Sequence, residues 1–136
     1  MRLNPYVMFN GQCDEAFKLY EQVLGAKTTF KMTFGESPAS GDMPPELQNL
    51  IIHAALAIDD QLLLASDAPP DRYEAPKGIY VSIHLTDAAK GKQIFEALAE
   101  NGAVQMPFEK TFWAEGFGMC IDRFGIPWMV NCGPES

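Results

Sequence analysis

Residues 113–131 read WAEGFGMCIDRFGIPWMVN. Two mostly apolar runs, residues 116–121 and 126–131, flank Arg123, Phe124 and Gly125, which form a turn-like sequence. Short runs of this kind, separated by a turn that contains glycine, are typical of two neighbouring antiparallel strands. The stretch therefore predicts the closing β-hairpin of a sheet.

The residues before this hairpin complete a module. Residues 79–85 predict a strand, residues 88–100 a helix, and residues 104–112 a further extended segment. Thr86 or Asp87 can cap the start of the helix. Together with the hairpin, these elements have the order β-α-β-β-β.

The first half of the chain repeats this order. A helix is predicted at residues 14–24, and strands at residues 5–9, 27–34, 50–58 and 61–65. Gly25 follows the first helix, where a left-handed cap is common, and Gly102 takes the corresponding place after the second. Alternation in the second strand predicts one shared face for Thr28, Phe30, Met32 and Phe34.

A single module of this kind exposes one apolar sheet face, which a second module can cover. We therefore predict an α+β fold of two tandem βαβββ modules, about residues 1–68 and 78–136. They form a curved, cupped mixed β-sheet with the helices on the outside, around a hollow suited to a ligand. Residues 1–136 are expected to be one domain, because a chain of this size buries roughly two-thirds of its surface around one core. Two questions stay open: whether the modules pair within a chain or between chains, and what the loop at residues 35–48 does.

Composition excludes several classes of partner. The formal net charge is −8 and the basic residues are scattered, so nucleic acid and anionic membranes are not expected partners. No apolar stretch approaches the ~20 residues of a spanning helix, and the first residues do not resemble a signal peptide. The three cysteines show no paired spacing, which favours a reducing compartment. A cytoplasmic location is the expectation.

The stretch at residues 113–131 resembles the closing segment of PhnB-like proteins. These belong to the glyoxalase/bleomycin-resistance/dioxygenase (vicinal oxygen chelate) superfamily. The shared pattern is a Trp, then Phe-Gly, then Asp-x-Phe-Gly, then a Trp and an Asn. Further matches are Tyr6, Phe9, Gly11, Glu15, Ala16, Tyr20, Leu24, Gly25, Ala26, His53, Ser66, Asp67, Phe95, Leu98, Met106 and Pro107. The resemblance implies paired βαβββ modules, a small-molecule ligand and a homodimer. The methyltransferase label that some members carry is not supported, because the chain lacks the glycine-rich strand–helix turn that holds such a cofactor.

The resemblance also implies where a metal would bind. Many superfamily enzymes hold a divalent ion with His, Glu or Gln side chains from both modules. The corresponding places here lie near residues 4–6, residues 62–64, Val81 and Met129. The first stretch contains no His or Glu, and the other three places offer aliphatic or thioether side chains. A thioether is a poor ligand for a hard divalent ion. We therefore expect no metal site and no cofactor.

His53 is the candidate catalytic residue. It lies among Ile and Ala residues on a predicted inner strand, where an imidazole can orient a substrate or move a proton. The alternative is a core histidine bonded to a neighbour. Ala55 occupies the place where relatives often show Glu, so a His–Glu pair is absent. His84, Cys120 and Asp122 are interpreted as a strand-end residue, an inert thiol and a turn residue.

Six further side chains are candidate ligand contacts. They are Ser66, Asp67, Phe112, Trp113, Phe117 and Asn131. Turn formation is the alternative for the first two, core packing for the three rings, and an edge backbone contact for the asparagine. The predicted function is a metal-independent enzyme or binder for a small organic molecule. Its alternatives are a non-catalytic sequestering protein of the bleomycin-resistance type and a regulatory protein with a vestigial cleft.

Overall fold

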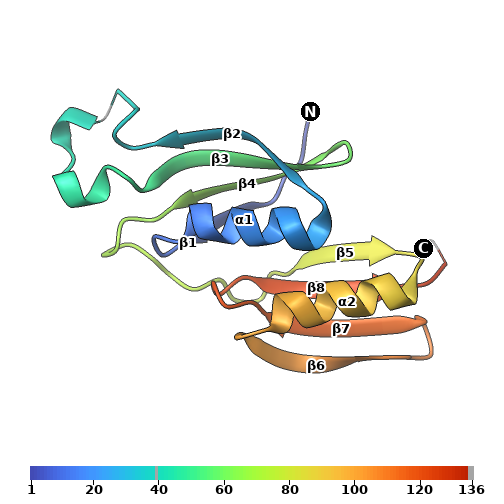
Figure 1. Cartoon of the computed structure of the whole chain (residues 1–136). Coiled ribbons are helices and arrows are strands. Elements are labelled where there is room, and N and C mark those ends of the chain that lie inside the picture. The colour runs from blue at the N-terminus through green and yellow to red at the C-terminus, as the bar shows by residue number, and fades with distance from the viewer. Residues whose placement is uncertain (39, 135–136) are drawn as a thin grey trace. The chain divides into compact units, whose positions relative to one another are not determined.

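The computed structural model describes residues 1–38 and 40–134 (Figure 1). In the first half, helix α1 (Cys13–Leu24) follows the first of four strands, β1 (Tyr6–Phe9), β2 (Lys27–Thr33), β3 (Ile51–Ile58) and β4 (Gln61–Asp67). In the second half, helix α2 (Ala88–Ala99) follows the first of β5 (Val81–Leu85), β6 (Ala103–Glu109), β7 (Gly116–Ile121) and β8 (Pro127–Cys132). Two single 3₁₀ turns, η1 (Ser40–Asp42) and η2 (Pro45–Leu47), lie in the loop between β2 and β3.

The chain divides into two compact units, Met1–Glu74 and Ala75–Ser136. The sheet of unit 1 has the order β1-β4-β3-β2, and the sheet of unit 2 has the order β5-β8-β7-β6. Both sheets are mixed, because β1 runs parallel to β4 and β5 runs parallel to β8 while the other pairs are antiparallel. The predicted α+β fold of two βαβββ modules is confirmed. That the whole chain is one domain stays a prediction.

Each helix covers one face of its own sheet (Figure 1). In unit 1 the Phe9 ring meets the Phe17 and Tyr20 rings of α1 at centroid distances of 6.4 Å. In unit 2 Phe95 of α2 lies so close to Gly118 that a Cβ there would come within 2.7 Å of the ring. The main core side chains on these covered faces include Phe9, Phe17, Tyr20, Leu56, Phe95, Leu98, Trp128 and Val130. Burial of each such side chain stabilises the fold by about 1.5–3 kcal/mol.

The two helices begin differently. Asp87 caps α2, because its carboxylate accepts hydrogen bonds from the backbone N–H groups of Ala89 (3.0 Å) and Lys90 (3.1 Å). This confirms one of the two caps predicted there, and such a cap is worth about 1 kcal/mol. The start of α1 is held by a remote carboxylate, that of Asp67 on β4, which accepts from Cys13 N–H at 2.9 Å. None of the helices among the described residues is long and apolar enough to span a membrane.

The helices also end differently, and one prediction is wrong here. Gly25 has the predicted left-handed conformation, with φ 65°. After α2 the left-handed residue is Asn101, with φ 61°, and not Gly102. Gly102 instead permits a close backbone contact, since a Cβ there would lie 2.1 Å from the Ile121 carbonyl oxygen. Asparagine tolerates the left-handed region, which frees the glycine for this contact.

The predicted alternation along β2 is also wrong in part. Thr28 pairs with Leu56 while Phe30 pairs with Ala55, so the two residues face opposite sides of the sheet. Register shifts between Thr28 and Phe30, and again between Met32 and Thr33, produce this change. A β-bulge inserts one extra residue into a strand and reverses the faces beyond it. Phe30 and Met32 keep the shared face that alternation predicts, and Phe34 lies beyond the strand.

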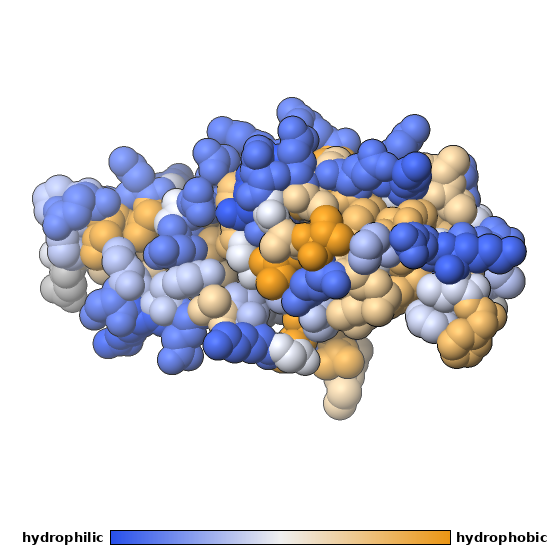
Figure 2. All heavy atoms as spheres, turned by 90° about the horizontal axis from the view of Figure 1, so that it is seen from below, coloured by the Kyte–Doolittle hydropathy of each residue, from blue (hydrophilic) through white to orange (hydrophobic). Residues whose placement is uncertain are grey.

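Hydrophobic side chains also reach the surface of the molecule. Figure 2 shows them as orange patches between hydrophilic residues. The exposed large apolar residues on or beside the strands include Tyr6, Met8, Phe30, Val104, Met106, Phe112 and Trp113. Contiguous exposed apolar surface on a small protein commonly marks an interaction or ligand site.

Candidate functional site

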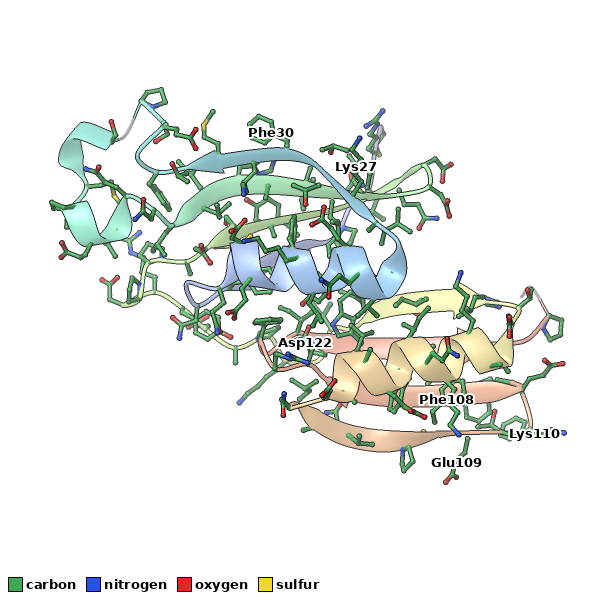
Figure 3. All side chains as sticks on the ribbon, in the orientation of Figure 1. Lys27, Phe30, Phe108, Glu109, Lys110 and Asp122 are labelled. Carbon is green, nitrogen blue, oxygen red and sulfur yellow. The ribbon has the colours of Figure 1, made fainter. Side chains whose placement is uncertain are left out.

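The sheet of unit 1 has one face that no helix of that unit covers in the described residues. Its side chains follow from the strand register, because directly paired residues point to the same side. Phe30, Ala55, Leu64 and Tyr6 form one row across all four strands, and Met32–His53 and Met8–Ser66 are the next pairs along. We call this surface open face 1. Figure 3 shows Phe30 extending from β2 away from α1.

His53 lies between two aromatic rings on open face 1. Its ring stacks on Tyr6 with a centroid distance of 5.7 Å and meets Phe30 at the same distance with a tilt of 49°. The Tyr6 hydroxyl lies 3.1 Å from Nδ1 of His53. Ala55, in the same row as Phe30 and Tyr6, is only 6% exposed. The histidine is thus held by two aromatic neighbours on this face.

The hydrogen bond to Tyr6 uses Nδ1 of His53 and leaves Nε2 available to a ligand. Nδ1 is bound by the Tyr6 hydroxyl, which donates when Nδ1 is unprotonated and accepts when Nδ1 carries the proton. Nε2 has no hydrogen-bond partner within residues 1–38 and 40–134. A fixed imidazole with one free nitrogen can accept a proton from a bound molecule or donate one to it.

Ser66 and Asp67 point to opposite faces of their sheet. β4 extends two residues past the range 61–65, and Ser66 and Asp67 are its last residues, where they pair with Met8 and Phe9 of the parallel strand β1. Ser66 therefore faces open face 1, where its hydroxyl donates to the Met8 sulfur at 3.3 Å. Asp67 faces the helix together with Phe9.

The Asp67 carboxylate stabilises the fold by accepting backbone hydrogen bonds from two elements. Oδ1 accepts from Cys13 N–H and Oδ2 from Ile51 N–H, each at 2.9 Å. Burial raises the pKa of this carboxyl above its ordinary value, against the lowering effect of hydrogen bonds from the backbone of Ile51, Cys13 and Gly11. Both oxygens are thus used to join α1, β3 and β4. Contact of Asp67 with a ligand stays an untested prediction, and we do not include this residue in the proposed site.

The sheet of unit 2 has a corresponding uncovered surface, which we call open face 2. Its central row consists of Met106, Met119 and Met129, paired across β6, β7 and β8. The next row contains Phe117 paired with Asn131. Asn131 in turn pairs with His84 on β5, and Phe117 with Glu109 on β6.

Three of the predicted ligand contacts are connected rings. Trp113 meets Phe117 edge-on at a centroid distance of 5.4 Å, and Phe112 meets Trp113 in the same manner at 4.7 Å. Phe112 is 97% exposed, because β6 ends at Glu109 and not at residue 112 as predicted. The rings therefore form an exposed aromatic group at one end of open face 2, which core packing does not explain for Phe112.

Asn131 carries an unsatisfied polar atom. Its Oδ1 is buried and has no hydrogen-bond partner within the described residues, although the residue as a whole is half-buried. A buried polar atom without a partner costs about 1–3 kcal/mol. The predicted alternative, a bond from this side chain to an edge backbone group, is absent for this oxygen.

Near the places where the resemblance implies a metal, the side chains do not fit a divalent ion. On the uncovered faces, Tyr6 pairs with Leu64 in unit 1 and Ser82, the neighbour of Val81, pairs with Met129 in unit 2. Val81 itself pairs with Trp128 on the covered face. Neither pair offers a carboxylate or an imidazole, which hard and borderline divalent ions require. No group of three or more His, Cys, Asp or Glu side chains suited to a metal occurs among residues 1–38 and 40–134.

Asp122, which we interpreted as a turn residue, organises the hairpin between β7 and β8 (Figure 3). Its Oδ1 accepts from the backbone N–H groups of Phe124 (2.9 Å) and Ile126 (3.0 Å), and its Oδ2 from the Trp128 indole at 2.8 Å. Cys120 on the covered face is fully buried, and burial raises the pKa of its thiol to about 11. Both residues serve the fold.

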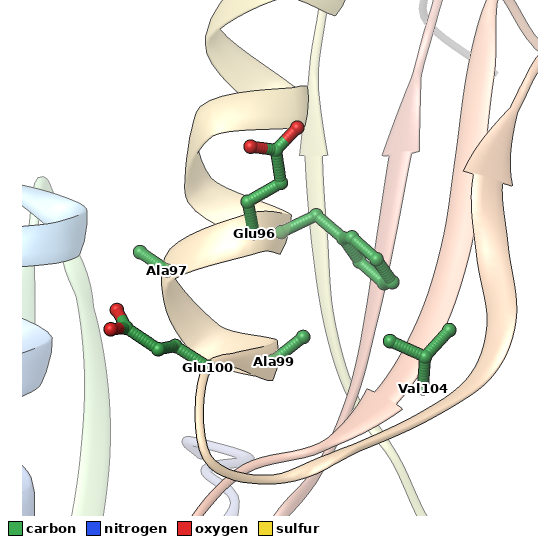
Figure 4. A pocket seen from close by; sticks show the side chains of 6 residues that line it. Glu96, Ala97, Ala99, Glu100 and Val104 are labelled. Atoms are coloured by element: carbon green, nitrogen blue, oxygen red, sulfur yellow. The ribbon is translucent and has the colours of Figure 1, made fainter.

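A hollow of about 470 Å³ lies between the end of α2 and the start of β6 (Figure 4). Its walls are Phe95, Glu96, Ala97, Ala99, Glu100 and Val104. None of the predicted site residues contributes to it. Its two carboxylates lie 3.9 Å from Lys92 and Arg123 respectively, as surface ion pairs do.

Several residues of the two open faces were not predicted as site residues from the sequence. Tyr6 and Phe30 were recognised only as a family match and as part of an alternating strand, and the methionine row was not recognised. The alternation along the strand is the sequence pattern that places Phe30 and Met32 on one face. The pairing of Met106 with Met119 depends on a bulge in β6, so no regular alternation could have placed it.

Comparison with known proteins gives a consistent picture. Residues 2–130 match the model of the Glyoxalase/Bleomycin resistance protein/Dioxygenase superfamily. Protein YjdN of Escherichia coli (strain K12) is 37% identical over 139 residues, covering 96% of this chain and 95% of that protein. The crystal structure of protein PA1353 from Pseudomonas aeruginosa is similar at 44% identity and a TM-score of 0.89, over 98% of each chain. A PhnB protein from Bacillus cereus, described as a putative 3-demethylubiquinone-9 3-methyltransferase, shares the fold at 18% identity and a TM-score of 0.82, over 98% of this chain and 100% of that one.

Proposed function

We propose that this chain, which belongs to the glyoxalase/bleomycin resistance protein/dioxygenase superfamily, binds a small organic molecule on open face 1. His53 orients that molecule or moves a proton on it, and no metal takes part. The observation that carries this proposal is the position of His53, held between Tyr6 and Phe30 with Nε2 free.

The arrangement supports this role for physical reasons. Aromatic side chains provide a large contact area with little loss of conformational freedom. The Tyr6 hydroxyl fixes the imidazole, so its Nε2 does not need to be ordered when a ligand binds. The buried Ser66 hydroxyl adds a second polar group to the same face. A ligand with an apolar body and one polar group would match these side chains.

A second candidate function is a non-catalytic binder, in which open face 2 holds an apolar molecule without changing it. The connected rings of Phe112, Trp113 and Phe117 favour this alternative, because they provide apolar contact area without a reactive group. Under either function, we propose Ser66 as a ligand contact on open face 1, and the three rings and Asn131 as ligand contacts on open face 2.

The assembly and location follow from the same reasoning. We propose a cytoplasmic homodimer, as the family resemblance and the unpaired cysteines suggest. A net charge of −8 supports small molecules and not nucleic acid as partners.

Native mass spectrometry of the freshly purified protein, combined with metal analysis, tests the proposal. It reports the number of subunits, any retained small molecule and any retained metal together. We expect an organic molecule and no stoichiometric metal. A metal bound at one equivalent per chain would contradict the proposed chemistry.

His53→Ala then separates the two functions, using the retained molecule or the strongest binder from a library of metabolite-sized compounds. An enzyme loses turnover and keeps most of its affinity, whereas a binder shows only a change in affinity. Gln93→Ala is the control, since this exposed side chain lies on helix α2 and on neither open face. If no compound protects the wild-type protein in a thermal-shift screen, small-molecule binding is contradicted.

A further inference from the structure

Methionines gather on the two open faces. Of the seven in the chain, five occupy strand positions on these faces, namely Met8, Met32, Met106, Met119 and Met129. Sheet surfaces ordinarily favour β-branched and aromatic residues, so methionine is not chosen for strand propensity. Its unbranched, polarisable side chain adapts to partners of irregular shape and makes favourable contacts with aromatic rings.

The densest group is the row Met106–Met119–Met129 on open face 2. The three residues are direct neighbours on adjacent strands. Met106 is 42% exposed, and the other two are half-buried. The row thus forms an accessible thioether surface, and a flat ring laid on it would contact three sulfur-containing side chains at once.

A hydrogen-bond acceptor lies beside this row. Asn131 is two residues from Met129 on β8, so it points to the same face at a distance of roughly 7 Å. Its Oδ1 is the buried atom without a partner in the described residues. Rotation about the Cβ–Cγ bond exchanges the positions of this oxygen and the amide nitrogen. The oxygen can therefore face an N–H or O–H group of a molecule bound on the face.

The surroundings select against negative charge. Glu109 is the register partner of Phe117 in the row that contains Asn131, and the chain as a whole carries a net charge of −8. The edge-on Trp113 and Phe117 rings border the same row. An anionic group would meet an unfavourable potential here, whereas an uncharged ring would not.

We propose that open face 2 binds an uncharged, flat aromatic molecule that carries an N–H or O–H donor. The ring lies on Met106, Met119 and Met129, and the donor binds the Asn131 amide oxygen. This inference rests on the proposed function in taking the open faces as small-molecule surfaces, and it specifies the chemical class that one of them accepts.

Methionine-methyl NMR of the full chain tests the proposal, with indole as the probe. Single Met→Leu variants assign the seven methyl signals. We expect indole to shift the signals of Met106, Met119 and Met129, and to leave Met1 and Met43 unchanged. We expect 1-methylindole, which has the same ring but no donor, to bind about fivefold more weakly, as the loss of one ordinary hydrogen bond implies.

Two further measurements make the test specific. Asn131→Ala should remove the difference in affinity between indole and 1-methylindole, while indole-3-carboxylate should bind the wild-type protein more weakly than indole. Methyl signals of the variant show whether it is folded. If it is not, the wild-type comparison of the two neutral probes decides alone.

The proposal is overturned if millimolar indole leaves the three row signals in place, if the wild-type protein binds both neutral probes equally, or if the anion binds best. Met8 and Met32 report separately on open face 1. Shifts there without shifts in the row would contradict this inference and leave the proposed function of His53 standing.

Discussion

The open faces of the two units share a strand pattern and differ in how their polar groups are satisfied. On open face 1, His53 is bonded to Tyr6 and held between two rings. On open face 2, Asn131 lies beside a methionine row and its oxygen has no partner in the described residues. The difference shows that a repeated fold does not repeat its chemistry. Strand order fixes where a side chain points, whereas the neighbouring residues decide what it can do.

The helix-covered faces of the two units differ less in how their polar groups are satisfied. Each unit buries one aspartate that accepts at least two backbone N–H groups, Asp67 in unit 1 and Asp122 in unit 2. The first joins a helix to two strands, and the second closes a hairpin and holds the Trp128 indole. The units therefore depend on comparable buried carboxylates while their open faces diverge.

The largest effect is expected from Asp122→Ala. The change leaves two backbone N–H groups and the Trp128 indole N–H without this acceptor, at about 1–3 kcal/mol each. We expect the free energy of unfolding to fall by roughly 3–9 kcal/mol, measured by urea denaturation of the full chain. Arg123→Ala, at the exposed neighbouring position, is the control and should change little. A loss below that of the control would refute the structural role of this carboxylate.

Asp67→Asn should lower the free energy of unfolding less than Asp122→Ala does. The amide keeps one acceptor oxygen, although its NH₂ group then faces the other N–H donor. We expect a loss of about 1–3 kcal/mol near neutral pH, with fraying at the start of α1 visible by hydrogen exchange of Cys13. The comparison of the two units is contradicted if this change is more damaging than Asp122→Ala.

The same variant has a predictable pH signature. Burial raises the pKa of Asp67 above its ordinary value of 3.8, so the folded protein holds this proton more tightly than the unfolded chain does. Its contribution to stability is therefore fully present below pH 3.8 and declines as the pH rises through the folded pKa. Asp67→Asn should lack this decline when denaturation curves are compared across acidic pH. If the free energies of unfolding of the wild-type protein and the variant change with pH in parallel, the pKa of Asp67 is not raised.

Leucine substitutions on the open faces should act in opposite directions. Asn131→Leu removes a buried polar atom without a partner and should stabilise the chain by about 1 kcal/mol or more, whereas His53→Leu removes a satisfied bond and should destabilise it by about 1 kcal/mol. Thermal denaturation of the two variants measures both shifts. Equal destabilisation would mean that Asn131 is satisfied as well as His53 is, and the contrast between the faces would disappear.

Thiol reactivity should show no difference between the units. Cys13 in unit 1 and Cys120 and Cys132 in unit 2 are all fully buried. Burial raises the pKa of the Cys13 thiol to about 12 and that of Cys120 to about 11, so almost no thiolate exists at pH 8. Ellman's reagent should therefore react with the folded protein only slowly, and at once with all three thiols in 6 M guanidinium chloride, a strongly denaturing concentration. Rapid reaction of one thiol in the folded protein would locate a unit that opens.

The sequence by itself determined the modules and their order. Periodicity placed the two helices and eight strands of the described residues to within a few residues, because burial of an apolar stripe or face imposes its own spacing on the chain. Local chemistry also marked Gly25 and Asp122 correctly and narrowed the cap of α2 to Thr86 or Asp87, since a cap or a tight turn involves only neighbouring residues. The family followed from the stretch at residues 113–131.

Only the tertiary structure decided which side chains meet. The bulges in β2 and β6 set the register that brings Phe30 beside His53 and Met106 beside Met119, and a shift of one residue would have reversed both placements. Ser66 and Asp67 were predicted together, but continuation of β4 beside β1 places them on opposite faces. These outcomes depend on pairing between strands far apart in the chain, which no local pattern records.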